Sequence, residues 1–188
     1  MPRHASAIAF LFCVLCLGCR AQEQEKDVQR WLRDGKLAFR LPDLAGNMVS
    51  SEDQRFKNKV VLLDVWGTWC PPCREMTPFL KDLHARFASE GLEIVGVAFQ
   101  LPAEEGEEDP ESVVSEYIAH NDVPYLNLFA GTAEHPSTLV FTKLPLLQFD
   151  GFPTVVIVAR DGTVKLIEEG FDGAKARRME ALVRDLLG

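Results

Sequence analysis

A chain of 188 residues with 47% apolar and 26% charged side chains has the composition of one soluble globular domain, and it is too short for two large ones. The formal net charge of −8 at pH 7 excludes the basic face with which a nucleic-acid-binding protein releases counterions from phosphate. The acidic balance bears on solubility and on the approach of partners, and not on the fold.

The N-terminal segment has the parts of a secretory signal peptide. Arg3 and the α-amino group form a short positive region, and an almost unbroken apolar run follows over residues 5–17. This run is shorter than the roughly 20 residues that a membrane-spanning helix needs, and a polar stretch comes after it. We therefore predict a signal peptide over residues 1–18, cleavage before Cys19 and a tether over residues 19–36.

The end of this segment, Leu15-Cys-Leu-Gly-Cys19, resembles a bacterial lipobox, in which a small residue precedes the cysteine that receives lipid. Gly18 fits the motif, whereas Cys16 stands where leucine is usual. We expect lipid on Cys19 to hold the domain on a membrane surface, at the periplasmic side of a bacterial cell envelope. The alternative is plain cleavage, which leaves Cys19 unmodified and the protein secreted.

The five cysteines of the chain then fall into three groups: two in the signal peptide, one at the lipid site and two in the domain. Cys13 and Cys16 leave with the signal peptide, and Cys19 carries the lipid. Cys70 and Cys73 are left in the domain. Exported proteins use cysteines as structural cross-links, but two cysteines three positions apart close too small a loop to stabilise much of a fold. The pair is therefore predicted to take part in a reaction and not to serve as a structural cross-link.

From residue 37 to residue 188 the sequence alternates strand and helix patterns, which predicts one α/β domain with a mixed sheet. The run at 60–66 is apolar except for Asp64, as in a central strand buried on both faces. Residues 104–111 form an acidic loop that we expect to be solvated, and residues 130–150 are interpreted as an irregular insertion. Strands are predicted over Leu37–Leu44, Val60–Trp66, Leu92–Phe99, Tyr125–Phe129, Thr154–Ala159 and Thr163–Glu168, and helices over Pro72–Ser89, Pro110–Ala119 and Ala174–Leu187.

Cys70 and Cys73 stand where a predicted strand gives way to a predicted helix. The free N–H groups and the dipole of a helix N-terminus favour an anion, so we expect a lowered pKa for the Cys70 thiol. A thiolate attacks disulfides, and Cys73 is close enough to resolve the mixed disulfide that Cys70 forms. Pro71 and Pro72 remove N–H donors from between the two sulfurs and pre-set helical φ.

The segment Trp66-Gly-Thr-Trp-Cys-Pro-Pro-Cys73, with Pro78 in the next helix, Phe152-Pro-Thr154 and the last hairpin and helix, resembles the thioredoxin superfamily over residues 38–187. Within that superfamily it is similar to the TlpA-like or ResA-like branch of membrane-anchored, reducing proteins. The resemblance implies a thioredoxin-like three-layer α/β/α fold with a central mixed β-sheet.

The resemblance also implies roles for Pro153 and Asp64. Alone, Pro153 is a turn proline at the start of a strand. In thioredoxin-like proteins the matching proline is cis and faces the cysteines. Asp64 interrupts an apolar strand, so it lies either at a solvated edge or buried near Cys73 with a raised pKa. Thioredoxins carry an acid at the matching place, which favours a buried acid that relays the proton of the resolving thiol.

Three residues around the cysteines are predicted to form the surface on which partner proteins dock: Trp69, Pro71 and Phe152. Trp69 directly precedes Cys70 and is expected in an exposed apolar rim, although packing alone would also explain it. Trp66 is predicted to be part of the core.

Other interpretations of the cysteine pair stay open. Zinc needs four ligands, and the sequence offers no second Cys-X-X-Cys and no histidine pair. Copper binding with His135 is an alternative, although copper-delivering relatives usually have three residues between their cysteines. A purely structural disulfide is another alternative. We expect no metal and no cofactor other than the redox-active disulfide.

The predicted function is that of an enzyme, an extracytoplasmic thiol–disulfide oxidoreductase that reduces protein disulfides. Its partners would be protein disulfide or dithiol substrates and an upstream electron donor in the cell envelope, and the protein is expected to be a monomer. One alternative is a peroxiredoxin-like peroxidase, but that class resembles Pro-X-X-X-Thr-X-X-Cys, and this chain has Trp-Gly-Thr-Trp-Cys70. The other is a non-catalytic copper-binding module.

Overall fold

The computed structural model describes residues 32–33 and 36–188 of the chain. The predicted signal peptide, the predicted lipid site Cys19 and most of the predicted tether lie outside the described residues. Within the described ranges, none of the helices combines the length and the apolar content that a bilayer crossing requires.

A mixed five-stranded sheet forms the centre of the molecule, in the order β5-β4-β3-β6-β7. β3 pairs in parallel with β4 and antiparallel with β6, so it is the middle strand of the sheet. The strands are β1 (Arg40–Pro42), β2 (Met48–Ser50), β3 (Val60–Trp66), β4 (Leu92–Gln100), β5 (Leu126–Thr132), β6 (Thr154–Val158) and β7 (Val164–Glu169). The helices are α2 (Pro71–Phe87), α3 (Pro110–His120), α4 (Pro136–Lys143) and α5 (Gly173–Leu187), with short 3-10 turns η2 (Gln54–Phe56) and η3 (Ala88–Glu90).

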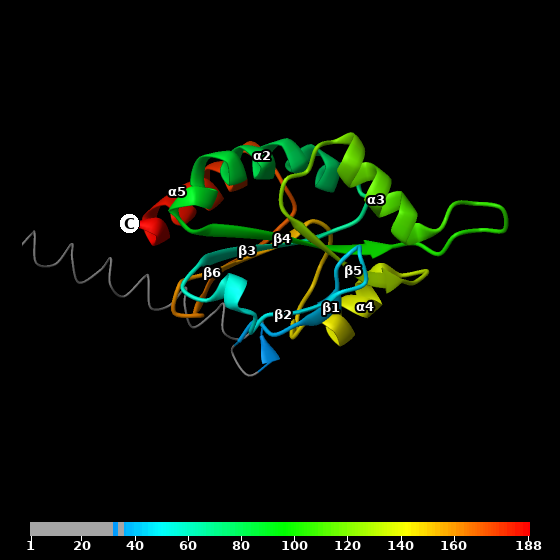
Figure 1. Cartoon of the computed structure of the whole chain (residues 1–188), viewed down its shortest axis with the longest axis horizontal. Coiled ribbons are helices and arrows are strands. Elements are labelled where there is room, and N and C mark those ends of the chain that lie inside the picture. The colour runs from blue at the N-terminus through cyan, green and yellow to red at the C-terminus, as the bar shows by residue number, and fades with distance from the viewer. Residues whose placement is uncertain (1–31, 34–35) are drawn as a thin grey trace, which may run out of the picture.

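Two layers cover the faces of this sheet (Figure 1). Helices α2, α3 and α5 lie on one face, and the β1–β2 ribbon with α4 lies on the other. Side chains alternate along β3, so Val60 and Leu62 pack with α2 and α5, whereas Val61 and Leu63 pack on the opposite side. The predicted thioredoxin-like α/β fold with a central mixed sheet is confirmed.

The structure differs from the sequence prediction in two segments. The strand predicted over Leu37–Leu44 is reduced to β1, which pairs antiparallel with the unpredicted β2. The stretch predicted as irregular, 130–150, contains the end of β5 and all of α4. Pro136 is the first residue of α4, where a proline costs no hydrogen bond, and the helix is too short for its apolar periodicity to stand out.

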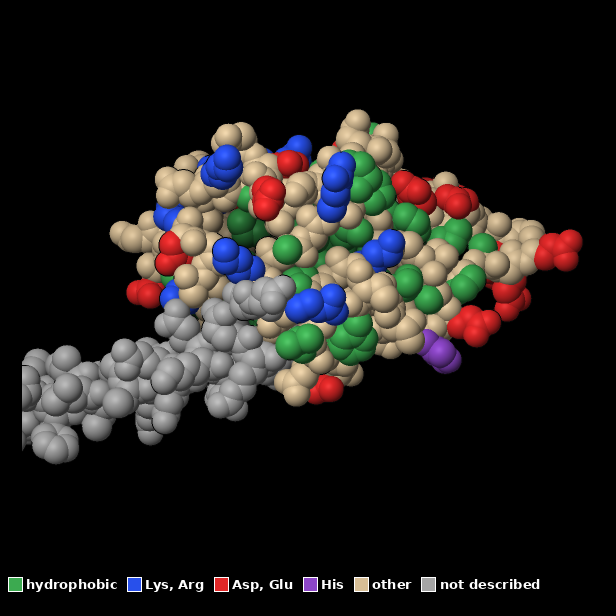
Figure 2. Space-filling view, turned by 90° about the horizontal axis from the view of Figure 1, so that it is seen from below, with side chains coloured by type: hydrophobic (Ala, Val, Ile, Leu, Met, Phe, Trp, Pro, Cys, Tyr) green, Lys and Arg blue, Asp and Glu red, His purple; other side chains and the backbone are tan. Residues whose placement is uncertain are grey.

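The acidic loop between β4 and α3 projects from one end of the molecule (Figure 1), and Figure 2 shows acidic side chains gathered there. Residues 101–109 are all exposed, as predicted for the solvated loop, whereas Pro110 and Glu111 at the end of the predicted loop are the first residues of α3. Asp109 ends the loop and caps α3, because its carboxylate accepts a hydrogen bond from the Ser112 N–H at 3.1 Å.

Candidate functional site

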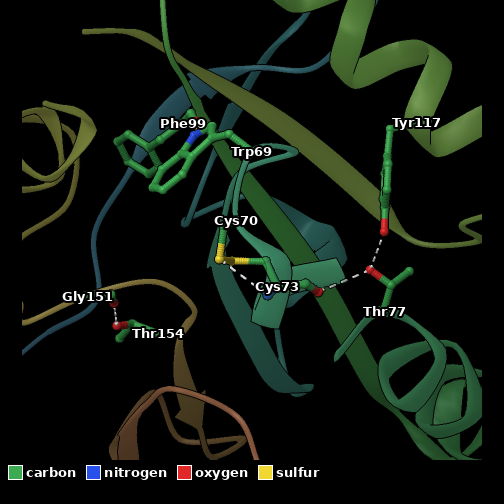
Figure 3. Close-up of a disulfide and its surroundings, with 8 residues drawn as sticks. All are labelled: Trp69, Cys70, Cys73, Thr77, Phe99, Tyr117, Gly151 and Thr154. Atoms are coloured by element: carbon green, nitrogen blue, oxygen red, sulfur yellow. Dashed lines mark hydrogen bonds between the residues drawn. A yellow bond between two sulfur atoms is a disulfide. The ribbon is translucent and has the colours of Figure 1, made fainter. Parts of the chain in front are cut away.

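Cys70 and Cys73 are joined by a disulfide at the junction of β3 and α2 (Figure 3). Cys70 is the N-cap residue of α2, and its Sγ accepts a hydrogen bond from the Cys73 N–H at 3.3 Å. Pro71 and Pro72 have no N–H, so the amide of Cys73 is the first donor that the helix can offer. The two prolines thus leave one amide directed at the Cys70 sulfur.

The disulfide is almost closed off from solvent. Cys70 is 3% exposed and Cys73 is 1% exposed. Pro71, directly after Cys70, is exposed, whereas Trp69 and Phe152 are half-buried. Trp69 and Phe152 pack against the buried cluster that contains both cysteines, so the surroundings of the disulfide are apolar.

Trp69, the residue before Cys70, is held in a defined orientation. Its indole N–H donates a hydrogen bond to the Phe99 carbonyl at 2.9 Å, and its ring meets the edge of the Phe152 ring at 5.0 Å. Gly67 makes room for this arrangement, since a Cβ there would lie 2.4 Å from the Trp69 indole nitrogen and 2.5 Å from the Phe99 carbonyl oxygen. The sequence did not single out Gly67 or Phe99.

The loop before β6 brings Phe152 against the Trp69 ring. The Phe152–Pro153 peptide bond is cis, as the resemblance implied, and Pro153 is buried. The Thr154 hydroxyl donates to the Gly151 carbonyl at 2.7 Å (Figure 3). The Pro153 carbonyl accepts from the Gly170 N–H at 2.7 Å, so the loop is tied to the end of β7.

A side-chain hydrogen bond is a second connection between this loop and β7. The Asp150 N–H donates to the Glu169 side chain at 2.7 Å. Partial burial of Glu169 raises the pKa of its carboxyl above the usual value. Sequence reasoning missed this contact, because Glu169 looks like an ordinary acidic residue at the end of a strand.

Asp64 lies in the centre of the sheet, and the alternative of a solvated edge position is wrong. It pairs with Gly96 on β4 and with Val155 on β6, and it is 4% exposed. Because side chains alternate, Asp64 points to the same face as Leu62 and Trp66, the face that α2 covers.

The environment of Asp64 is unfavourable for a charge. Loss of hydration on burial raises the pKa of its carboxyl well above the usual value. Its Oδ1 atom has no hydrogen-bond partner among the described residues. Such a group holds its proton to an unusually high pH and is able to exchange it with a neighbouring acid or base.

Trp66 is buried, as predicted, and takes part in a polar contact that the sequence did not reveal. Its indole N–H donates to the Asn127 Oδ1 at 3.2 Å across Gly96. A Cβ at Gly96 would lie 2.0 Å from that Oδ1 atom, so only glycine leaves the two side chains free to meet. Tyr117 of α3 packs against the Trp66 ring at 5.3 Å between centroids.

His135 is the residue before α4. Within the described residues, no group of three or more His, Cys, Asp and Glu side chains is placed to hold a metal ion.

Comparison with known proteins places this arrangement in context. The family described as Redoxin matches residues 33–183. The chain is 32% identical over 168 residues to the thiol-disulfide oxidoreductase ResA of Oceanobacillus iheyensis, covering 86% of this chain and 77% of the relative. It is 34% identical over 79 residues to ResA of Bacillus thuringiensis, where the match covers 42% of each chain.

Solved structures of thiol:disulfide interchange proteins superpose on this chain. A protein from Chlorobium tepidum assigned as the thiol:disulfide interchange protein DsbE superposes with a TM-score of 0.62 at 26% identity, covering 80% of this chain and 94% of that one. A thiol:disulfide interchange protein from Bacteroides superposes with a TM-score of 0.58 at 25% identity, covering 81% and 91%.

Proposed function

We propose that this chain, which belongs to the Redoxin family, is a thiol–disulfide oxidoreductase. It reduces protein disulfides through Cys70 and Cys73. The observation that carries the proposal is the Cys73 amide directed at the Cys70 sulfur at 3.3 Å. An amide in this place stabilises a thiolate on Cys70 more than a neutral thiol, and the thiolate is the attacking form. The disulfide itself is then the only redox group required.

The proposed reaction transfers two electrons from the reduced pair to the partner. The Cys70 thiolate attacks one sulfur of the partner disulfide, and the other partner sulfur leaves as a thiolate. Cys73 then loses its proton and attacks the Cys70 sulfur, which releases the second partner thiolate. The products are the Cys70–Cys73 disulfide and a partner dithiol, so an upstream dithiol donor must reduce the pair again.

Asp64 is proposed to accept the proton of Cys73 in the second step. A raised pKa makes the ionised Asp64 carboxylate a stronger base, and its position on the face covered by α2 also supports this role. Trp69, Pro71 and Phe152 are proposed to contact the partner, because Trp69 and Phe152 pack against the cluster that contains both cysteines and Pro71 is exposed directly after Cys70. Pro153 is proposed to present its backbone to the same partner.

Two assays test the proposed function. Wild-type protein with a thiol regenerant should reduce a disulfide-bonded protein such as insulin, and it should not consume hydrogen peroxide at a comparable rate. The potential of the Cys70–Cys73 couple should lie at or below the about −200 mV of glutaredoxins. A potential near the about −120 mV of strong oxidants would reverse the proposed direction of electron flow, and rapid peroxide consumption would indicate a peroxidase.

The location is a further part of the proposal. We propose that the protein works outside the cytoplasm, as a monomer held on a membrane surface by lipid on Cys19, which the motif Leu17-Gly-Cys19 supports. Cys19→Ser should move the protein from the membrane fraction to the soluble fraction when it is expressed in a bacterium. Labelling with a radioactive fatty acid should mark the wild type and not this variant. Equal labelling of both proteins would contradict the lipid site.

A further inference from the structure

A chain of two side-chain hydroxyls ends on the backbone of Cys73 (Figure 3). The Thr77 hydroxyl donates to the Cys73 carbonyl oxygen at 3.4 Å. The hydroxyl oxygens of Thr77 and Tyr117 lie 3.0 Å apart, within hydrogen-bond distance. Thr77 belongs to α2, whereas Tyr117 comes from α3, so the chain joins two helices.

The direction of both hydrogen bonds follows from counting protons. Thr77 has one hydroxyl hydrogen, and the Cys73 carbonyl is only an acceptor, so that hydrogen points to Cys73. The Tyr117 hydroxyl must then be the donor in the shorter contact. A threonine whose oxygen accepts from a tyrosine becomes a better donor, so the two bonds strengthen each other.

The position of Tyr117 is set independently of α2. Its ring packs against Trp66 on β3 at 5.3 Å between centroids, and α3 carries it there. Thr77 is 7% exposed, so its hydroxyl has little access to competing water. The hydroxyl chain therefore connects the first turn of α2 to a separately packed part of the fold.

Cys73 is held at both of its backbone groups as a result. Its N–H donates to the Cys70 sulfur at 3.3 Å, and its carbonyl accepts from Thr77. Together these contacts restrict the backbone torsions that carry the Cys73 sulfur. A restricted sulfur meets Cys70 more often than a free one, which raises its effective concentration for closing the disulfide.

We infer that Tyr117 and Thr77 are positioning residues that hold Cys73 in the geometry for attack on Cys70, an inference that rests on the proposed exchange reaction. The hydroxyl chain makes the Cys70–Cys73 disulfide easier to form and speeds the release of a sulfur bound to Cys70. The hydroxyl chain meets Cys73 at its carbonyl oxygen, so each hydroxyl acts through the Cys73 backbone.

The test removes each hydroxyl and keeps the shape of the side chain. Tyr117→Phe retains the ring on Trp66, and Thr77→Val retains the branched β-carbon. Each full-length variant is equilibrated with glutathione, and the fraction of Cys70–Cys73 disulfide is measured by mass. Each variant should form the disulfide about two- to tenfold less favourably than the wild type, which corresponds to a potential about 10–30 mV more positive.

A rate measurement separates positioning from general loss of stability. A small thiol reagent is attached to Cys70, and its release by Cys73 is followed over pH 6 to 9 in each variant. Release should slow by a similar factor at every pH, because the geometry changes and no titrating group is removed. The double variant should lose little more than either single variant, since both residues act through one chain.

Two controls complete the design. Thr77→Ser keeps the hydroxyl and should restore the wild-type potential. Thr142→Val in α4 removes a hydroxyl that also donates to a helix carbonyl, that of Leu139 at 2.8 Å, and should leave the potential unchanged. If Thr77→Val does not fold, Tyr117→Phe decides the question alone. A wild-type potential and release rate in Tyr117→Phe overturn the inference.

Neither measurement needs a protein substrate. A wild type that fails to reduce protein disulfides would therefore defeat the proposed function, whereas the equilibrium with glutathione would still report on Tyr117 and Thr77.

Discussion

Cys73→Ala should produce a protein that captures its partners on Cys70 and does not release them. The Cys70 sulfur can still accept a hydrogen bond from the backbone N–H at position 73 in this variant, because the substitution changes only the side chain. The attack on a partner disulfide therefore proceeds, but the thiol that completes the exchange is missing. Turnover should fall by at least about a hundredfold.

The capture is measured by trapping with acid, alkylation and non-reducing electrophoresis, after incubation with cell-envelope extract or with insulin. The matched control is Cys70→Ala, which should trap nothing and should also lack turnover. Mixed disulfides on Cys73 in that control would show that the two cysteines have the opposite roles. Mass spectrometry of the trapped species would give the identity of the partners.

Asp64→Asn should slow the release of the mixed disulfide by about a hundredfold at pH values where the wild-type Asp64 carboxyl is ionised, and it should leave the first attack almost unchanged. The asparagine side chain has the shape of aspartate but cannot accept the Cys73 proton. Stopped-flow measurement of both steps over pH 6 to 9 checks this. A release rate equal to that of the wild type throughout this range would remove Asp64 from the mechanism.

The same substitution should stabilise the folded protein. Burial raises the folded-state pKa of Asp64, so the folded protein keeps this proton at pH values where the unfolded chain has lost it. Stability therefore falls as the pH rises from the unfolded pKa near 3.8 through the higher folded pKa. Asp64→Asn lacks this loss, so its advantage in the free energy of unfolding should grow as the pH rises from about 4 and should level off once the folded-state carboxyl has ionised. Urea unfolding at several pH values measures it.

The sequence predicted the elements whose signals are local. The apolar run fixes β3 at Val60–Trp66, and the prolines after Cys70 place the start of α2 within one residue. A turn at Gly162, where φ is +85°, marks the hairpin between β6 and β7. Each of these signals is contained within a few neighbouring residues.

The features that escaped prediction depend on residues far apart in the chain. The contact of Trp66 with Asn127 spans 61 positions, and that of Thr77 with Tyr117 spans 40. Neither Asn127 nor Tyr117 belongs to a motif, and each acquires its contact only when β5 has paired with β4 and α3 has packed on the sheet. Nothing in the sequence near either residue indicates which side chain it contacts in the folded protein.

The cysteine pair and the Pro153 loop also differ in how much of the chain must fold before each is in place. The cysteines are three positions apart, so their sulfurs can meet in an unfolded chain at a small entropic cost. The Pro153 loop reaches them only after β6 has paired with β3, where Val65 lies opposite Thr154. Contacts of such long sequence separation form late and slowly. Oxidation of the pair is therefore no measure of correct folding, because the disulfide can close before the Pro153 loop reaches it.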